Sequence, residues 1–157
     1  MGNKKGKIKK KGLPTKVTVS AHQLRGQSYQ TLFSSIAMRK GYIVEEPTVP
    51  CPWDYTLRNV HESWKNWRVQ VKGTEGYTHG HCDRYRITLK HGAKNTLTSI
   101  NPNFVDVVAC YVENYDVWYN IPVTALTSKK AMYLYPHNRE STGQYECWKH
   151  DWSVFNT

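Results

Sequence analysis

The sequence predicts a mixed α/β fold, a sheet of about five strands with a long helix on one face, and three patterns carry this prediction. Ser20 and Gln23 form a capping box that begins a helix, and Gly41 ends it. Residues 67–74 alternate polar and apolar side chains, which is the period of a strand. The run 104–112 is almost entirely apolar, as is typical of a central strand covered on both faces. A chain of 157 residues fits one domain.

The expected helix has an apolar stripe that can pack on the sheet. This stripe consists of Leu24, Ser28, Leu32 and Ile36, with Tyr29, Phe33 and Ala37 beside them. A strip of small residues on its flank would let another backbone approach, and it is made of Gly26, Gln30, Ser34 and Ala37. Gln30 is therefore expected to point towards a neighbouring element, where it can face a site. A solvated helix glutamine is the alternative.

Shorter runs predict the strands on either side of the site. Residues 42–44 and 52–57 form two of them, and the prolines between them interrupt the chain. Residues 84–90 alternate apolar with mostly basic side chains. Arg84 and Arg86 then lie on an outer face that can follow a phosphate backbone or simply face solvent.

The C-terminal half predicts an edge strand and an aromatic cover. Pro122 limits the strand at 117–122 to an edge or an end of a sheet. The aromatic segment 143–155 is expected to pack back on the sheet, with stacking on bases as the alternative. Asp106 lies within an apolar run and is expected to pair with an Arg or Lys such as Arg86, because an unpaired buried carboxylate costs several kcal/mol. A contribution to the metal site is the alternative.

The polar residues of greatest functional interest lie on the strands 52–57 and 67–74. If these strands pair as a hairpin, Asp54 comes close to Gln70 and Lys72, because alternate residues of a strand share a face. A carboxylate, a side-chain amide and an ammonium on one patch suit a hard divalent cation beside an activated water. An ordinary polar strand pair at the surface fits the same spacing.

Positive charge is concentrated at the N-terminus, although the whole chain carries a net charge of +10. Residues 1–16 contain no acid and hold seven lysines, namely Lys4, Lys5, Lys7, Lys9, Lys10, Lys11 and Lys16. Such a Lys/Gly-rich segment cannot bury enough surface to fold alone. We therefore expect a flexible arm at 1–16 that binds nucleic-acid phosphates, followed by one folded domain at 17–157. A solubilising leader is the alternative for the arm.

Several classes of protein are disfavoured. No apolar run approaches the roughly 20 residues that span a bilayer, and no apolar region follows the basic N-terminus as in a secretory signal. The protein is thus expected in the cytoplasm or with the host nucleoid, neither secreted nor in a membrane. His79, His81 and Cys82 suggest zinc, but no second cluster has matching spacing.

The order of these motifs resembles the PD-(D/E)xK nuclease superfamily. Asp54 followed by Gln70, Val71 and Lys72 is similar to the variant typical of small endonucleases encoded in group I introns, in which Gln replaces the second acid. The resemblance covers roughly residues 26–150. Its flanking segments lie at 26–30, 41–44, 104–111, 117–122 and 133–145. The chain departs from the family at Gln30, where the family usually has Glu.

The resemblance implies a restriction-endonuclease-like αβββαβ core with extra strands, and Mg²⁺-dependent (or Mn²⁺-dependent) hydrolysis of double-stranded DNA. Asp54, the side-chain oxygen of Gln70 and the backbone carbonyl of Val71 would hold the metal. Lys72 would orient or deprotonate the attacking water, and Gln30 would complete the catalytic set. The arm lysines and three arginines would contact DNA, and these arginines are Arg68, Arg84 and Arg86. Cutting both strands requires two sites, so a homodimer or a dimer of dimers is expected.

The number of carboxylates leaves a second function open. Only Asp54 is a clear anionic ligand, and Glu45, Glu46 and Glu62 are the candidates for another. The alternative is a catalytically inactive DNA-binding (or RNA-binding) protein on a nuclease scaffold. Lys72 favours the nuclease, because a binding protein has no special need of an ammonium there, and the loss of the helix Glu favours the alternative.

Overall fold

The computed structural model describes residues 19–62, 64–78, 84–90, 99–128, 130–138, 140 and 142–156. The basic arm and the His79–Cys82 cluster lie outside the described residues. The regular elements are α1 (Ala21–Arg39), β1 (Tyr42–Glu45), β2 (Tyr55–Asn59), β3 (Asn66–Thr74), β4 (Tyr77–Thr78), β5 (Arg84–Thr88), β6 (Val107–Val112), β7 (Val117–Pro122) and β8 (Ala131–Leu134). Four 3₁₀ turns accompany them, at Glu113–Tyr115, Val123–Ala125, Glu146–Trp148 and Ser153–Asn156.

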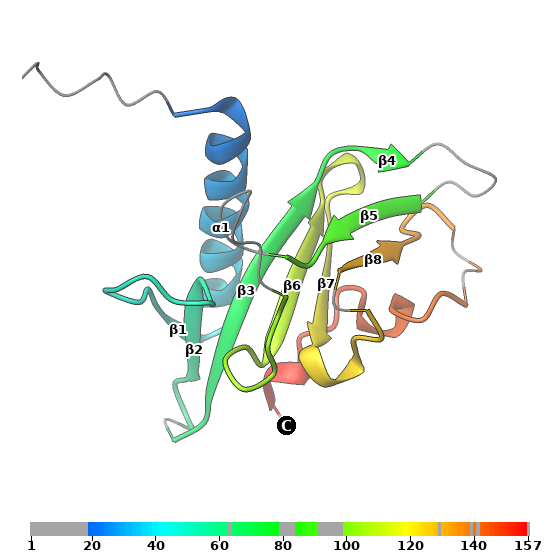
Figure 1. Ribbon diagram of the computed structural model, residues 1–157. Helices are drawn as coiled ribbons and strands as arrows, with labels where there is room; N and C mark the ends of the chain where they lie inside the picture. Colours follow the sequence, from blue (N-terminus) through cyan, green and yellow to red (C-terminus); the bar gives the residue numbers. More distant parts are fainter. Residues whose placement is uncertain are drawn as a thin grey trace, which may run out of the picture.

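Two sheets form the scaffold (Figure 1), which confirms the predicted mixed α/β class. The five-stranded sheet has the order β1-β2-β3-β6-β7, and the other sheet has the order β4-β5-β8. Strands β3 and β6 are parallel, whereas the other neighbours in both sheets are antiparallel. A parallel pair needs a crossover connection. In the described part of the chain, the connection from β3 to β6 contains β4 and β5. The expected αβββαβ arrangement would place its second helix in this connection.

Helix α1 covers one face of the five-stranded sheet. Ser20 and Gln23 form the predicted capping box, and Gly41 follows the helix with a φ of +90°. The buried helix face consists of Tyr29, Phe33 and Ala37. The predicted stripe was centred too far round the helix, since Leu24 and Leu32 are exposed. The aromatic flank faces inward because Phe33 packs against the rings of Tyr55 and Trp118 on the sheet and of Trp152 in the C-terminal segment.

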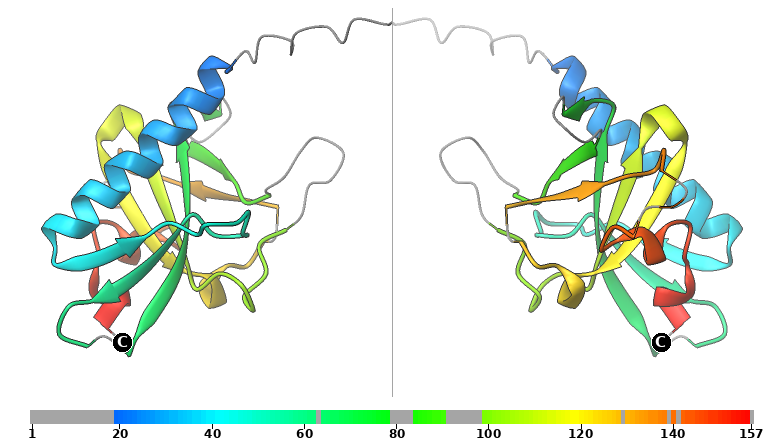
Figure 2. Two further views of the ribbon diagram at one scale, coloured as in Figure 1. Left: turned by 90° about the vertical axis from the view of Figure 1, so that its left-hand side faces the viewer. Right: turned by 90° about the vertical axis from the view of Figure 1, so that its right-hand side faces the viewer.

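The second face of the five-stranded sheet packs on the small sheet, so the large sheet lies between two cores (Figure 2). Strand β6 is buried at every position, as the apolar run predicts, although it begins at Val107. Val108 and Cys110 face the small sheet, whereas Val107 and Ala109 face the helix. This sandwiching gives the neighbouring strand β3 a rigid setting on both sides.

The C-terminal segment packs on the sheet, as expected. Tyr145 and Phe155 are buried, and Trp152 stacks on Phe33 with ring centroids 5.5 Å apart. Pro122 ends β7, which is an edge strand. Within the described residues, no helix has the length and apolarity required to cross a membrane.

Candidate active site

The antiparallel pairing of β2 and β3 brings Asp54 to the expected strand. Tyr55 pairs with Val69, and the Asp54 amide donates to the Val69 carbonyl over 2.8 Å. Asp54 therefore lies just before β2, and its Oδ2 accepts a hydrogen bond from the Val71 amide at 2.7 Å. The ladder begins later than predicted, in keeping with Pro52, which has no N–H to donate.

The other carboxylate oxygen of Asp54 is bound by the helix. Gln30 donates from Nε2 to Asp54 Oδ1 over 2.9 Å. The two hydrogen bonds, one from α1 and one from β3, fix the plane of the carboxylate. A carboxylate has about four lone-pair positions, so it can accept both bonds and still bind a cation. Gln30 thus reaches the site, where it acts on Asp54.

Gln70 is buried, and its side-chain oxygen is an acceptor without a hydrogen bond among the described residues. Its side chain is 4% exposed, and Nε2 donates to the Pro52 carbonyl over 3.1 Å. That bond fixes the orientation of the amide. Among the described residues, Gln70 Oε1 has no hydrogen-bond partner. Leaving such an acceptor buried costs about 1–3 kcal/mol, which a ligand at this oxygen would offset.

Lys72 is partly buried on the same face of β3 as Gln70. Burial lowers the pKa of Lys72, while the negative charge of Asp54 opposes this change. Cys110 is the β6 partner of Lys72 in the ladder, and burial raises the pKa of its thiol to about 12. The thiol is therefore neutral at physiological pH, and Asp54 is the anion that faces Lys72.

Two clefts meet at Gln30. The larger, about 510 Å³, is also lined by Tyr29 and Lys72, and the smaller, about 350 Å³, is also lined by Asp54 and Glu46. Gln30 thus separates the carboxylate side of the site from the ammonium side.

The three candidate glutamates differ in position. Glu46 lines the cleft with Asp54. Burial, together with the charges of these two carboxylates, raises the pKa of Tyr55 to about 12. Glu45 instead forms a side-chain ion pair with Arg58 of the neighbouring strand β2. Glu62 pairs with Lys65 at 3.5 Å in the turn between β2 and β3. Glu46 is therefore the one of the three that shares a cleft with the site.

Asp106 is paired with an arginine, as predicted, but its partner is Arg68 and not the suggested Arg86. Asp106 Oδ2 accepts bonds from the backbone N and Nε of Arg68 at 2.7 and 3.0 Å, and a third bond joins Oδ1 to Nη2 at 2.8 Å. The parallel register, with Val69 opposite Val107, places these residues side by side. Arg86, the expected partner, lies on β5 in the other sheet.

Arg84 and Arg86 lie on β5 and alternate with buried residues, as predicted. The Arg84 guanidinium lies 4.0 Å from the centroid of the Tyr133 ring, and Arg86 is exposed opposite Tyr133 in the ladder. These side chains form a basic and aromatic face on the small sheet, whereas Asp54 lies at the five-stranded sheet.

The donor set fits a hard cation that takes several ligands from water and phosphate. Within the described part of the chain, no three His, Cys, Asp or Glu side chains converge as metal ligands. The possible oxygen ligands are the Asp54 carboxylate, Gln70 Oε1 and the Val71 carbonyl. The Val71 carbonyl is included because N–H and C=O of one strand residue point to the same side, and the Val71 N–H donates to Asp54. Mg²⁺ commonly binds through one or two carboxylates plus substrate phosphates.

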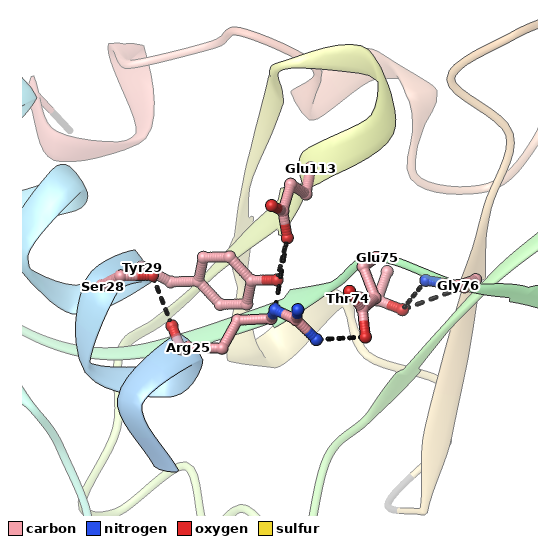
Figure 3. A network of polar contacts seen from close by, with 7 residues as sticks. All are labelled: Arg25, Ser28, Tyr29, Thr74, Glu75, Gly76 and Glu113. Carbon is pink, nitrogen blue, oxygen red and sulfur yellow. Dashed lines mark hydrogen bonds and ion pairs between the residues drawn. The ribbon is translucent and has the colours of Figure 1, made fainter. Parts of the chain in front are cut away.

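Sequence reasoning missed a polar network at the helix side of β3, which joins Tyr29, Arg25, Glu75 and Glu113 (Figure 3). Its partners come from α1, from the end of β3 and from the turn after β6. Gly73, inside β3, was the one available signal, because a glycine in a strand interior often marks a close approach.

No family model and no curated protein matches this sequence. Fifteen chains of solved structures do match. One is the bacterial homing endonuclease I-Ssp6803I, which superposes with a TM-score of 0.71 at 18% sequence identity, covering 86% of this chain and 93% of that chain. This chain therefore has the fold seen in a bacterial homing endonuclease.

Proposed function

We propose that this protein is a DNA endonuclease that depends on Mg²⁺ or Mn²⁺, of the homing or mobile-element type. The observation that carries the proposal is the placement of Asp54. Its carboxylate is held by Gln30 and the Val71 amide, and its charge acts on Lys72. Gln70, whose Oε1 has no partner among the described residues, lies on the same strand and face as Lys72. The fold shared with a homing endonuclease supports the same assignment.

In this proposal each residue has a distinct task. Asp54, Gln70 Oε1 and the Val71 carbonyl would hold the cation, which when bound supplies charge neutralisation at the phosphate and a water of lowered pKa. Lys72 orients the attacking water and offsets negative charge on the scissile phosphate. Its lowered pKa makes proton transfer easier than for a solvated lysine. Gln30 acts one step further back by orienting Asp54.

DNA binding would use surfaces beyond the site. The lysines of residues 1–16 supply a sequence-independent attraction to phosphates, and Arg84 with Arg86 supplies a second basic face. Arg68 contributes to DNA binding only if part of its guanidinium remains available beside Asp106. Two copies of the protein would be needed to cut both strands.

One observation favours a second candidate function. Asp54 and Glu46 are the carboxylates that line the smaller cleft, and Gln30 and Gln70 are neutral. A scaffold with so little negative charge could bind DNA without cutting it.

Plasmid cleavage separates the two candidates. Purified protein is incubated with supercoiled plasmid and Mg²⁺ or Mn²⁺, and Lys72→Ala is the matched variant. Nicking or linearisation by wild type, lost in Lys72→Ala with DNA affinity retained, supports the endonuclease. Tight DNA binding without cleavage under any divalent cation identifies the inactive binding protein.

A further inference from the structure

Tyr29 lies across the strand that carries Lys72. Its ring covers Gly73, the residue that follows Lys72, so closely that a Cβ on Gly73 would overlap the ring. Gly73 does not end the strand, as β3 continues to Thr74. The glycine therefore serves close contact rather than a turn. A strand interior is weakened by glycine, so this contact is maintained at some cost in stability.

The far end of the Tyr29 ring is also fixed. Its hydroxyl donates to Glu113 Oε2 over 2.6 Å, and Glu113 begins the turn directly after β6. Arg25, one helical turn before Tyr29, lies 3.8 Å from the same oxygen and also pairs with Glu75 just beyond β3 (Figure 3). Tyr29 thus joins α1 to β3 and to the end of β6.

The same turn of α1 contacts both halves of the site. Gln30 binds Asp54, and Tyr29 packs on the residue next to Lys72. Displacement of the ring would move the backbone of β3 relative to Asp54. A misplacement of about 1 Å can cost roughly 100-fold in rate.

We propose that Tyr29, through its contact with Gly73 and its hydrogen bond to Glu113, is a positioning residue that sets Lys72 relative to Asp54. This inference rests on the proposed endonuclease function. Tyr29 acts on Lys72 through strand β3 and not by contact with the substrate.

The conservative variant Tyr29→Phe keeps the ring and removes the bond to Glu113. Tyr42→Phe is the matched control, because Tyr42 is 7% exposed and Tyr29 is 6% exposed. This variant likewise removes one hydrogen bond, the 2.9 Å bond from the Tyr42 hydroxyl to Asn156. The readouts are the single-turnover cleavage rate at saturating DNA, the Kd for DNA and the Tm.

We expect Tyr29→Phe to cut DNA roughly 10-fold more slowly than wild type, with the Kd for DNA unchanged within about 2-fold. Tyr42→Phe should show a similar decrease in Tm and keep the wild-type cleavage rate. If Tyr29 only stabilised the fold, Tyr29→Phe would lower the Tm without slowing cleavage at an unchanged Kd. Cleavage by Tyr29→Phe at the wild-type rate overturns the proposal.

A double-mutant cycle tests the contact with Gly73. Gly73→Ala should slow cleavage because its Cβ collides with the ring, and Tyr29→Ala/Gly73→Ala should be less impaired than the two single effects combined. Additive effects would contradict the contact's role.

The two proposals fail in different ways. If wild type cleaves no DNA, the proposed function fails, and Tyr29 is then judged by acylation of Lys72 measured by mass spectrometry. We expect faster acylation of Lys72 in Tyr29→Phe than in wild type or Tyr42→Phe. Equal acylation in all three overturns the positioning role even without cleavage.

Discussion

Gln30 and Asp54 are joined by a 2.9 Å hydrogen bond from the side-chain amide to Oδ1, so the helix glutamine orients the carboxylate. An acid at this position would make no such bond when ionised. The bond explains how a neutral residue can serve at a position where the family resemblance implies Glu: it positions the one carboxylate that the site strands supply.

Gln30→Glu should place two carboxylates in contact and lower the Tm in the absence of divalent cations, because like charges disfavour each other's ionised form. Added Ca²⁺ or Mg²⁺ should restore the Tm and bind more tightly than to wild type. Differential scanning fluorimetry and isothermal titration measure both effects. Gln23→Glu is the control, since a capping box accepts Glu equally well. Identical cation affinity in wild type and Gln30→Glu would place Gln30 outside the metal site.

Lys72→Met should stabilise the protein at neutral pH by removing a partly buried ammonium. Burial lowers the pKa of Lys72 in the folded state, so the unfolded chain binds more protons between the folded pKa and about 10.4. Wild-type stability should therefore rise with pH in that window, and this rise should vanish in Lys72→Met. Urea denaturation at pH 7 and pH 9.5 tests the sign, with exposed Lys130→Met as control. A loss of stability at pH 7 would contradict the burial cost.

Asp106→Asn should lower the unfolding free energy by about 2 kcal/mol at neutral pH, because a charged acceptor of three bonds is lost. Burial tends to raise the pKa of Asp106, but the bonds from Arg68 outweigh it and lower that pKa. The stabilisation is present above the unfolded pKa of about 3.9 and is lost as pH falls through the folded pKa. Urea titrations at pH 7 and pH 3 should show the difference shrinking.

The partner of Asp106 can be checked separately. Arg68→Met should destabilise the protein at pH 7, and Arg86→Met should have little effect because Arg86 is exposed on the other sheet. The reverse order of effects would restore the pairing that the sequence suggested.

Deletion of residues 1–16 should weaken non-specific DNA binding and its salt dependence. Seven lysines that each neutralise one phosphate contribute about −6 to the slope of log K against log salt. Fluorescence anisotropy between 50 and 200 mM salt, roughly the range in which such slopes are resolved, measures the change. An unchanged slope would show that the arm does not contact DNA.

The sequence was most informative where a local period decides the structure. The capping box at Ser20, the alternation along β3 and the apolar run of β6 each predicted their element, and the β2–β3 pairing brought Asp54 to β3. These patterns are short-range, so they can be recognised without knowing the partner strands.

Contacts between distant segments could not be predicted in the same way. The buried side of α1 depends on which rings it meets, so its centre is the predicted flank of Tyr29, Phe33 and Ala37 and not the line of Leu24 and Leu32. The partner of Asp106 depends on the parallel register of β3 and β6, which no local pattern specifies. The Tyr29–Glu113 bond, 84 residues apart in sequence, arises from the same long-range register.

The role of Asp54 as the anionic metal ligand is tested by Mg²⁺-dependent cleavage of plasmid by wild type and by Asp54→Asn at equal DNA occupancy. Asn keeps the shape and can accept the bonds from Gln30 and Val71 at only one oxygen, and it removes the anionic ligand. We predict that wild type nicks DNA, and that Asp54→Asn binds DNA equally but cuts it at least about 100-fold more slowly. Ca²⁺ binding to the protein should weaken in parallel. Equal cleavage by the two proteins, with unchanged cation affinity, would contradict this role of Asp54.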